Sequence, residues 1–157
     1  DRDTLREILA RTGASGRVFV FEAAELPGAG SRSLAELVGD GWDLSGVIAS
    51  YRQFIDSFTP VLARLDGGAG IAPQDAFAIR TLLVHAYRRV QLHDPMLPVE
   101  LLPQPWPGVE AYNVARTLYL ATYRAAEEHI MTTLLREDAQ AQAAEDSFYQ
   151  RFGGLPR

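Results

Sequence analysis

The chain has 157 residues, a net charge of −5 and no cysteine, and 47% of its residues are hydrophobic. The length suits one domain or one domain with part of another, and no apolar run reaches the roughly 18 residues that a membrane helix needs. The missing cysteines exclude disulfides, cysteine-ligated zinc and thiol catalysis and fit a cytoplasmic protein, while the negative charge argues against a region that binds nucleic acid by itself.

The first predicted element is a short helix that begins at Thr4. Thr4 and Glu7 fit a capping box, and Gly13 is placed to end the helix. The apolar face that this helix would bury consists of Leu5, Ile8 and Leu9.

Residues 17–22 (RVFVFE) are β-branched, aromatic and apolar on both faces, which predicts a central strand. A lone strand leaves its backbone hydrogen-bonding groups unsatisfied, and one helix with one strand is not a stable unit. We therefore expect the partner strands in chain that precedes Asp1 or in another subunit. This sequence is then the C-terminal part of a longer protein.

A turn-rich stretch at 27–32 leads to a predicted short helix at 33–38, which Gly39 ends. Its inward residues would be Leu34, Leu37 and Val38. Residues 39–42 are interpreted as the boundary between a segment at 1–40 and a helical domain at 41–157.

The helical domain is predicted to hold about four helices, so the fold class is mostly α. Apolar residues recur with helical spacing from Leu44 to Leu65, where Pro60 should kink or split the helix and Gly67-Gly68 should end it. Pro73 fits the first position of a central helix that runs to about Val90.

A last long helix starts near Val109. Its expected inward residues are Tyr112, Ala115, Tyr119, Tyr123, Ala126, Ile130 and Leu134. Residues 136–147 could extend this helix or form a loose linker, and the frayed extension is favoured. Residues 147–155 combine three aromatic side chains with an arginine and end in a Gly-Gly turn.

The helix at 73–90 carries a polar stripe. Thr81, His85, Arg88 and Arg89 fall within an arc of roughly 100° on a helical wheel. If the helix is buried, these groups need partners. Two interpretations stay open, and they can coexist. One is internal pairing with Asp94, Glu100 or Asp75; the other is a pocket in which arginine forks hold a phosphate or carboxylate.

The loop that follows contains five of the nine prolines. Asp94-Pro95 predicts a turn. Pro98 could open, and Pro103 close, a single helical turn that contains Glu100. Trp106 stands between two prolines, and either a buried anchor or a ligand-stacking ring would explain it.

No catalytic or metal-binding pattern is present. His85, His93 and His129 are too scattered for a metal site, and no phosphate-binding glycine motif occurs. Neither a nucleophile paired with a base nor a cofactor motif is found. We therefore expect no cofactor, no metal and no enzymatic activity.

The run at 83–103 (LVHAYRRVQLHDPMLPVELLP), followed by Trp106 and Gly108, closely resembles the C-terminal domain of PaaX-type repressors of phenylacetic acid degradation. The resemblance extends through residues 18–25, 51–60 and 148–155. It is weakest at 136–147.

The resemblance implies an N-terminal winged helix that binds operator DNA and is absent here, a central ferredoxin-like (Cas2-like) α/β segment, and a helical C-terminal domain. The helix and strand at 1–40 would be the last part of the central segment. The family represses catabolic operons as a homodimer and is released by an aryl-acyl-CoA such as phenylacetyl-CoA.

An effector with phosphates and an aromatic acyl group suits the residues singled out here. The candidate effector-binding residues are Thr81, His85, Arg88, Arg89 and Trp106, and the motif Asp94, Pro95, Pro98, Glu100 and Pro103 is expected to be structural. A helical interaction module without a small ligand and an enzyme acting on CoA esters are the alternatives. The enzyme needs a nucleophile or base that the sequence does not supply.

Overall fold

The computed structural model describes residues 2–20, 32–66 and 70–155. These residues are mostly helical, which confirms the predicted class, and they contain no strand. The α-helices are α1 (Arg2–Arg11), α2 (Leu34–Gly41), α3 (Leu44–Asp66), α4 (Pro73–Gln91) and α5 (Gly108–Glu137). Two 3₁₀ helices, η1 (Val99–Leu101) and η2 (Asp146–Gly153), complete the fold.

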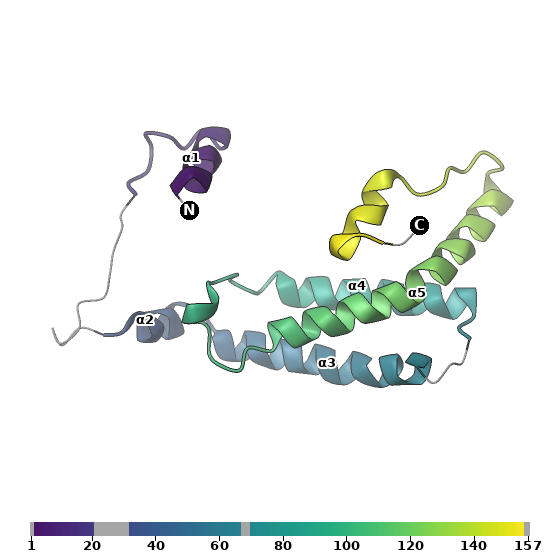
Figure 1. Cartoon of the computed structure of the whole chain (residues 1–157), viewed down its shortest axis with the longest axis horizontal. Coiled ribbons are helices and arrows are strands. Elements are labelled where there is room, and N and C mark those ends of the chain that lie inside the picture. The colour runs from purple at the N-terminus through teal and green to yellow at the C-terminus, as the bar shows by residue number, and fades with distance from the viewer. Residues whose placement is uncertain (1, 21–31, 67–69, 156–157) are drawn as a thin grey trace.

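Helices α3, α4 and α5 lie side by side and form the bundle that holds the core (Figure 1). Small residues of α5, including Ala111 and Ala115, are fully buried and allow close approach of the neighbouring helices. Large side chains fill the remaining space. The buried members of this core include Val47, Tyr51, Phe54, Leu83, Val90, Leu118, Tyr119, Tyr123, Phe148 and Leu155.

The periodic pattern at 44–65 forms one helix, because α3 continues unbroken through Pro60. Of the two predicted alternatives the split is wrong, and the kink stays a prediction. The described part of residues 41–157 contains three long α-helices and two 3₁₀ helices, where about four helices were expected. The helix ends at Asp66, directly before Gly67-Gly68, which lie outside the described residues. Pro73 occupies the first turn of α4, as predicted.

Helix α5 buries Tyr119 and Tyr123 as predicted, but Tyr112 is 40% and Leu134 is 45% exposed. The helix ends at Glu137, and the expected helical extension through 147 is wrong because Asp138 adopts an extended conformation. Residues 138–145 connect α5 to η2 without a helix. The segment η2 then returns to the bundle, where Phe148 and Leu155 enter the core.

Both helices predicted in the N-terminal segment form, as α1 and α2, but the predicted cap and strand do not. Helix α1 begins at Arg2, so Thr4 lies inside it and does not cap it. None of its residues is buried, and Figure 1 shows α1 standing away from the bundle. The expected strand is not formed at 17–20, where Phe19 is 90% exposed, because no described strand pairs with it; residues 21 and 22 lie outside the described part.

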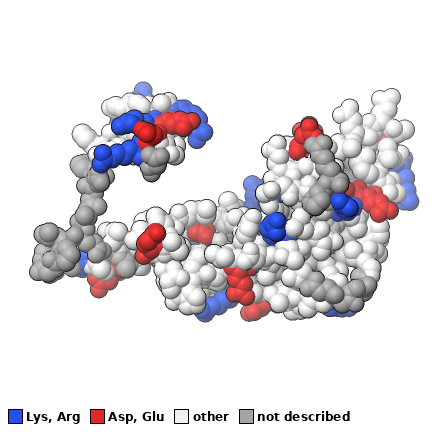
Figure 2. Space-filling view, viewed as in Figure 1, with Lys and Arg blue, Asp and Glu red and all other residues white. Residues whose placement is uncertain are grey.

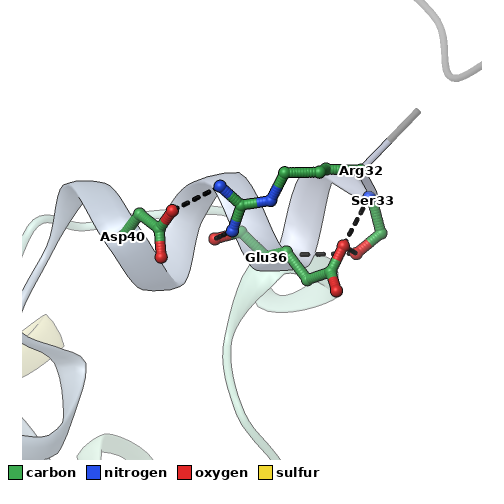
Figure 3. Close-up of polar contacts among 4 residues, drawn as sticks. All are labelled: Arg32, Ser33, Glu36 and Asp40. Carbon is green, nitrogen blue, oxygen red and sulfur yellow. Dashed lines mark hydrogen bonds and ion pairs between the residues drawn. The ribbon is translucent and has the colours of Figure 1, made fainter.

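The capping box belongs to α2 instead, as Figure 3 shows. The backbone N–H of Glu36 donates to Ser33 Oγ at 3.2 Å, and the N–H of Ser33 donates to Glu36 Oε2 at 2.9 Å. Arg32 extends past them to Asp40, with 2.5 Å between Nη1 and Oδ2. Val38 is buried, but the other two expected inward residues, Leu34 and Leu37, are exposed.

Candidate functional site

The polar stripe on α4 faces solvent. Thr81, His85, Arg88 and Arg89 are all exposed, so the premise that they need internal partners is wrong. Within the described residues, neither arginine forms an ion pair, and the predicted pairing with Asp94, Glu100 or Asp75 does not occur. These side chains are therefore available to a ligand.

The stripe divides between two grooves on opposite sides of α4. His85 and Arg89 line a groove between α3 and α4, whereas Arg88 lines a groove between α4, α5 and η2. Thr81 lines neither of these two grooves. The roughly 100° that separates adjacent side chains on a helix explains why neighbouring arginines serve different surfaces.

The groove between α4, α5 and η2, called the aromatic groove below, has a volume of about 670 Å³, and four of its eleven lining residues are aromatic. Its aromatic residues are Tyr87, Tyr112, Tyr119 and Phe152. Two basic residues, Arg88 and Arg151, lie among them. The groove thus combines flat apolar walls with two guanidinium groups, a composition that fits an aromatic ligand with a negative charge.

The segment η2 shapes one wall of this aromatic groove. Phe152 has a φ of +53°, an uncommon conformation for a bulky residue, and its ring lies 4.9 Å from that of Tyr119 between centroids. Arg151 donates to the hydroxyl of Tyr119 at 3.1 Å and lies over the ring of Phe148 at 4.9 Å. The two contacts with Tyr119 fix η2 against α5, and the contact between Arg151 and Phe148 lies within η2.

Tyr87 supplies an uncharged hydroxyl to the aromatic groove. Burial raises the pKa of Tyr87, and the nearby Tyr112 and Asp94 raise it further. A tyrosine hydroxyl is protonated at neutral pH even without this shift, and it can both donate and accept a hydrogen bond.

Sequence reasoning missed the one buried arginine of the described residues. Arg80 is 9% exposed and pairs with Glu127 of α5, and its guanidinium lies 5.9 Å from the centroid of the Phe148 ring. It occupies the core face of α4, four residues after Ala76 and three before Leu83. That spacing in an apolar helix is the signal that could have identified it.

The turn predicted at Asp94-Pro95 lies slightly earlier, at 92–93, and Asp94 ties the chain after it to the bundle. The hydroxyl of Tyr51 on α3 donates to Asp94 Oδ2 at 2.5 Å, and the other oxygen of Asp94 accepts the N–H of Met96 at 2.8 Å. Burial raises the pKa of Tyr51, and the hydrogen bond to Asp94 raises it further. Asp94 therefore connects the end of α4 to α3.

The rest of the proline-rich loop follows the expected pattern. Pro98 precedes the single turn of η1, in which the N–H of Leu101 donates to the Pro98 carbonyl at 2.9 Å. Glu100 is exposed within this turn, and Pro103 comes after its end. These contacts assign a local structural role to the loop backbone.

Trp106 packs as an anchor at the start of α5. Its ring meets that of Tyr51 edge-on, with 5.8 Å between centroids. A Cβ added to Gly108 would lie 2.5 Å from the indole nitrogen, so the glycine makes room for the tryptophan. A ligand-stacking role for Trp106 stays a prediction.

The described surface offers no continuous basic face in the view of Figure 2, where acidic and basic side chains are scattered over a largely uncharged bundle. Among the described residues, no three His, Asp or Glu side chains gather as metal ligands. None of the described helices combines the length and apolarity of a membrane span.

Comparison with known proteins gives a family. Residues 42–132 match the model of the PaaX-like protein C-terminal domain. Over 153 residues, the chain is 37% identical to the transcriptional repressor PaaX of Escherichia coli (strain K12). The match covers 96% of this chain and 48% of the relative. The chain therefore belongs to the PaaX-like family, as the resemblance predicted. It spans about half the length of the curated relative that it matches.

Proposed function

We propose that this chain is the effector-sensing and dimerisation portion of a cytoplasmic transcriptional repressor of an aromatic catabolic operon. The family match and the repressor to which this chain is 37% identical over 153 residues support a regulatory role. The proposal that this chain binds an effector rests on one observation, the groove of about 670 Å³ in which Arg88 and Arg151 lie among four aromatic rings.

The proposed effector is an aryl-acyl-CoA such as phenylacetyl-CoA. The groove volume lies within the usual range of roughly 300–1,000 Å³ for small-molecule sites. Its aromatic walls suit the aryl group, and Arg88 can form charge-assisted hydrogen bonds with the anionic part of the ligand. His85 and Arg89 remain candidates for ligand contact on the other side of α4. Thr81 and Trp106 line neither groove and remain candidates from the sequence alone.

The domain assignment completes the proposal. Residues 1–40 would belong to a ferredoxin-like (Cas2-like) segment, and residues 41–157 would form the sensing domain. The unburied apolar side chains of α1 and of residues 18–20 support this assignment, because a partner sheet would cover them. Operator DNA would be bound by a winged helix outside these residues, in keeping with the net charge of −5.

Release from DNA is proposed to follow from a shift in population. If the effector binds the DNA-incompetent form of the homodimer more tightly, occupancy lowers operator affinity by the ratio of the two binding constants. In the full-length repressor, phenylacetyl-CoA should weaken operator binding. Unchanged operator affinity at saturating ester would contradict the mechanism.

A thermal-shift titration tests the effector site directly. Phenylacetyl-CoA should raise the melting temperature of this chain, and Arg88→Ala should abolish the shift without lowering the melting temperature of the unliganded protein, because Arg88 is exposed and forms no described ion pair. Arg52→Ala, an exposed position on α3, serves as the matched control. A shift that survives in Arg88→Ala would remove Arg88 from the site.

A further inference from the structure

The groove between α3 and α4 differs in chemistry from the aromatic groove. It has a volume of about 450 Å³, and its lining includes three basic side chains: His85, Arg89 and His93. None of its lining residues is a carboxylate, although the chain as a whole carries a net charge of −5. A concave site with basic groups only is therefore set into an acidic chain.

The basic groups form a row. His85 and Arg89 are one helical turn apart on α4, and His93 follows one turn later, just beyond the helix end. At 1.5 Å per residue, the row is about 12 Å long, with the guanidinium in the middle. That length is measured along the backbone, and the long side chains can converge on a shorter anion; a phosphate group offers more acceptor oxygens to them than a single carboxylate does.

The donors of this row are available to a ligand. Arg89 and His85 have no ion-pair partner among the residues that the structure describes. Nδ1 of His93 lies 2.9 Å from the carbonyl oxygen of Arg89. Because a carbonyl only accepts, Nδ1 donates in that contact, and Nε2 becomes a second donor, able to meet an anion, only in the imidazolium form.

The hydroxyls in the lining do not compete for this role. Ser50 Oγ donates to the carbonyl of Gly46 at 2.9 Å, and Ser57 Oγ donates to the carbonyl of Gln53 at 2.7 Å. Their protons are committed to the α3 backbone. The hydrogen bonds to an anion would therefore come chiefly from the arginine fork, which phosphate oxygens favour, with the Gln53 amide and the imidazolium forms of the histidines as further donors.

We propose that the α3–α4 groove is a binding site for a phosphorylated small molecule, with Arg89 as the central contact and His85 and His93 on either side. The proposal stands on this groove alone and does not depend on the aryl-acyl-CoA assignment. The phosphate groups could come from the CoA part of an effector or from a separate phosphorylated compound, and the experiment separates the two.

The chain contains only three histidines, which makes ¹H–¹³C spectra of the imidazole Cε1–Hε1 groups a selective probe. Titration with pyrophosphate at fixed pH and ionic strength should move the His85 and His93 signals along one saturable curve. His129 should not move, because it lies on α5 with its ring 5.3 Å from that of Phe77. Equal, unsaturable drift of all three signals would overturn the proposal.

Two adjacent arginines supply matched variants. Arg89→Gln should weaken pyrophosphate binding at least about tenfold, the loss expected for a charge-assisted hydrogen bond. Arg88→Gln, which removes the same charge next to it but from the other groove, should change the dissociation constant by less than about twofold. Equal effects of the two variants would show a general loss of charge and would contradict the site.

The source of the phosphate follows from two further ligands. The groove holds the CoA part of an effector if two results are found. CoA must shift the His85 and His93 signals with a lower dissociation constant than pyrophosphate does, and 3′-dephospho-CoA must bind more weakly than CoA. If CoA binds no better than pyrophosphate, a separate phosphorylated ligand is indicated. Failure of phenylacetyl-CoA to stabilise the chain would refute the proposed effector and leave the pyrophosphate result unchanged.

Discussion

The hydrogen bond from Tyr51 to Asp94 connects α3 to the turn after α4, and its removal should loosen that junction. The donor and acceptor are 2.5 Å apart, and the residue Tyr51 is only 3% exposed. A hydrogen bond to a charged group contributes about 1.5–3 kcal/mol. Tyr51→Phe keeps the ring, including its edge contact with Trp106, and should lower the free energy of unfolding by about 2 kcal/mol. For a chain of this size, the melting temperature should fall by roughly 4–8 °C.

A double-mutant cycle measured by urea denaturation separates this bond from other effects. Asp94→Asn keeps an oxygen that can accept the N–H of Met96 but removes the charge that the hydroxyl of Tyr51 meets. The coupling energy between the two substitutions should be about 1–2 kcal/mol. A coupling below about 0.3 kcal/mol would refute the reasoning, because the two groups would then act independently.

The hydrogen bond between Tyr51 and Asp94 also predicts how the stability of the chain depends on pH. The pKa of Tyr51 is raised in the folded protein, first by burial and then by Asp94, whereas an unfolded tyrosine titrates near pH 10. Its contribution to stability is complete below about pH 10 and is lost as the pH rises above that value. The stability difference between wild type and Tyr51→Phe should therefore narrow above about pH 10. A difference that stays constant to about pH 11.5 would contradict the assignment.

Three further substitutions test separate parts of the fold. Arg80→Ala leaves Glu127 partly buried without its partner, so it should lower the free energy of unfolding, measured by urea denaturation, by about 3 kcal/mol. A loss below about 1 kcal/mol would mean that the ion pair contributes little to stability. Ser33→Ala should cost about 1 kcal/mol and should increase hydrogen exchange in α2 but not in α5; unchanged exchange in α2 would count against the capping box. Gly108→Ala should displace Trp106 and lower the free energy of unfolding by about 1–3 kcal/mol. In a variant with no other tryptophan, the substitution should also shift the fluorescence emission of Trp106. An unshifted spectrum would contradict the close approach of Gly108 and Trp106.

The long helices could be predicted from the sequence because their determinants are local. The apolar spacing of 44–65 and the proline at 73 act within one or two turns, and both were confirmed. Local motifs were not sufficient at the N-terminus. Thr4 and Ser33 both precede a glutamate by three residues, but only Ser33 caps a helix. The strand at 17–22 depended on pairing with other strands, and none is present in the described residues.

The candidate site shows the same limit. The sequence predicted a central helix at 73–90, but on α4 Leu82 and Val84 are 62% and 43% exposed. The polar stripe is exposed as well. The buried charge is Arg80 instead, because Glu127 meets it from α5, 47 residues away. Which residue finds such a partner is decided by helix packing and cannot be obtained from the spacing within one helix.

Isothermal titration calorimetry of this chain with phenylacetyl-CoA, free CoA and phenylacetate tests the central proposal most directly. If the groove beside Arg88 is the effector site, the ester binds saturably and more tightly than either of its parts, and Arg88→Ala weakens it at least about tenfold. If the ester binds no more tightly than free CoA, or does not bind at millimolar concentration, the aryl group is not recognised in these residues and the effector-sensing role is contradicted.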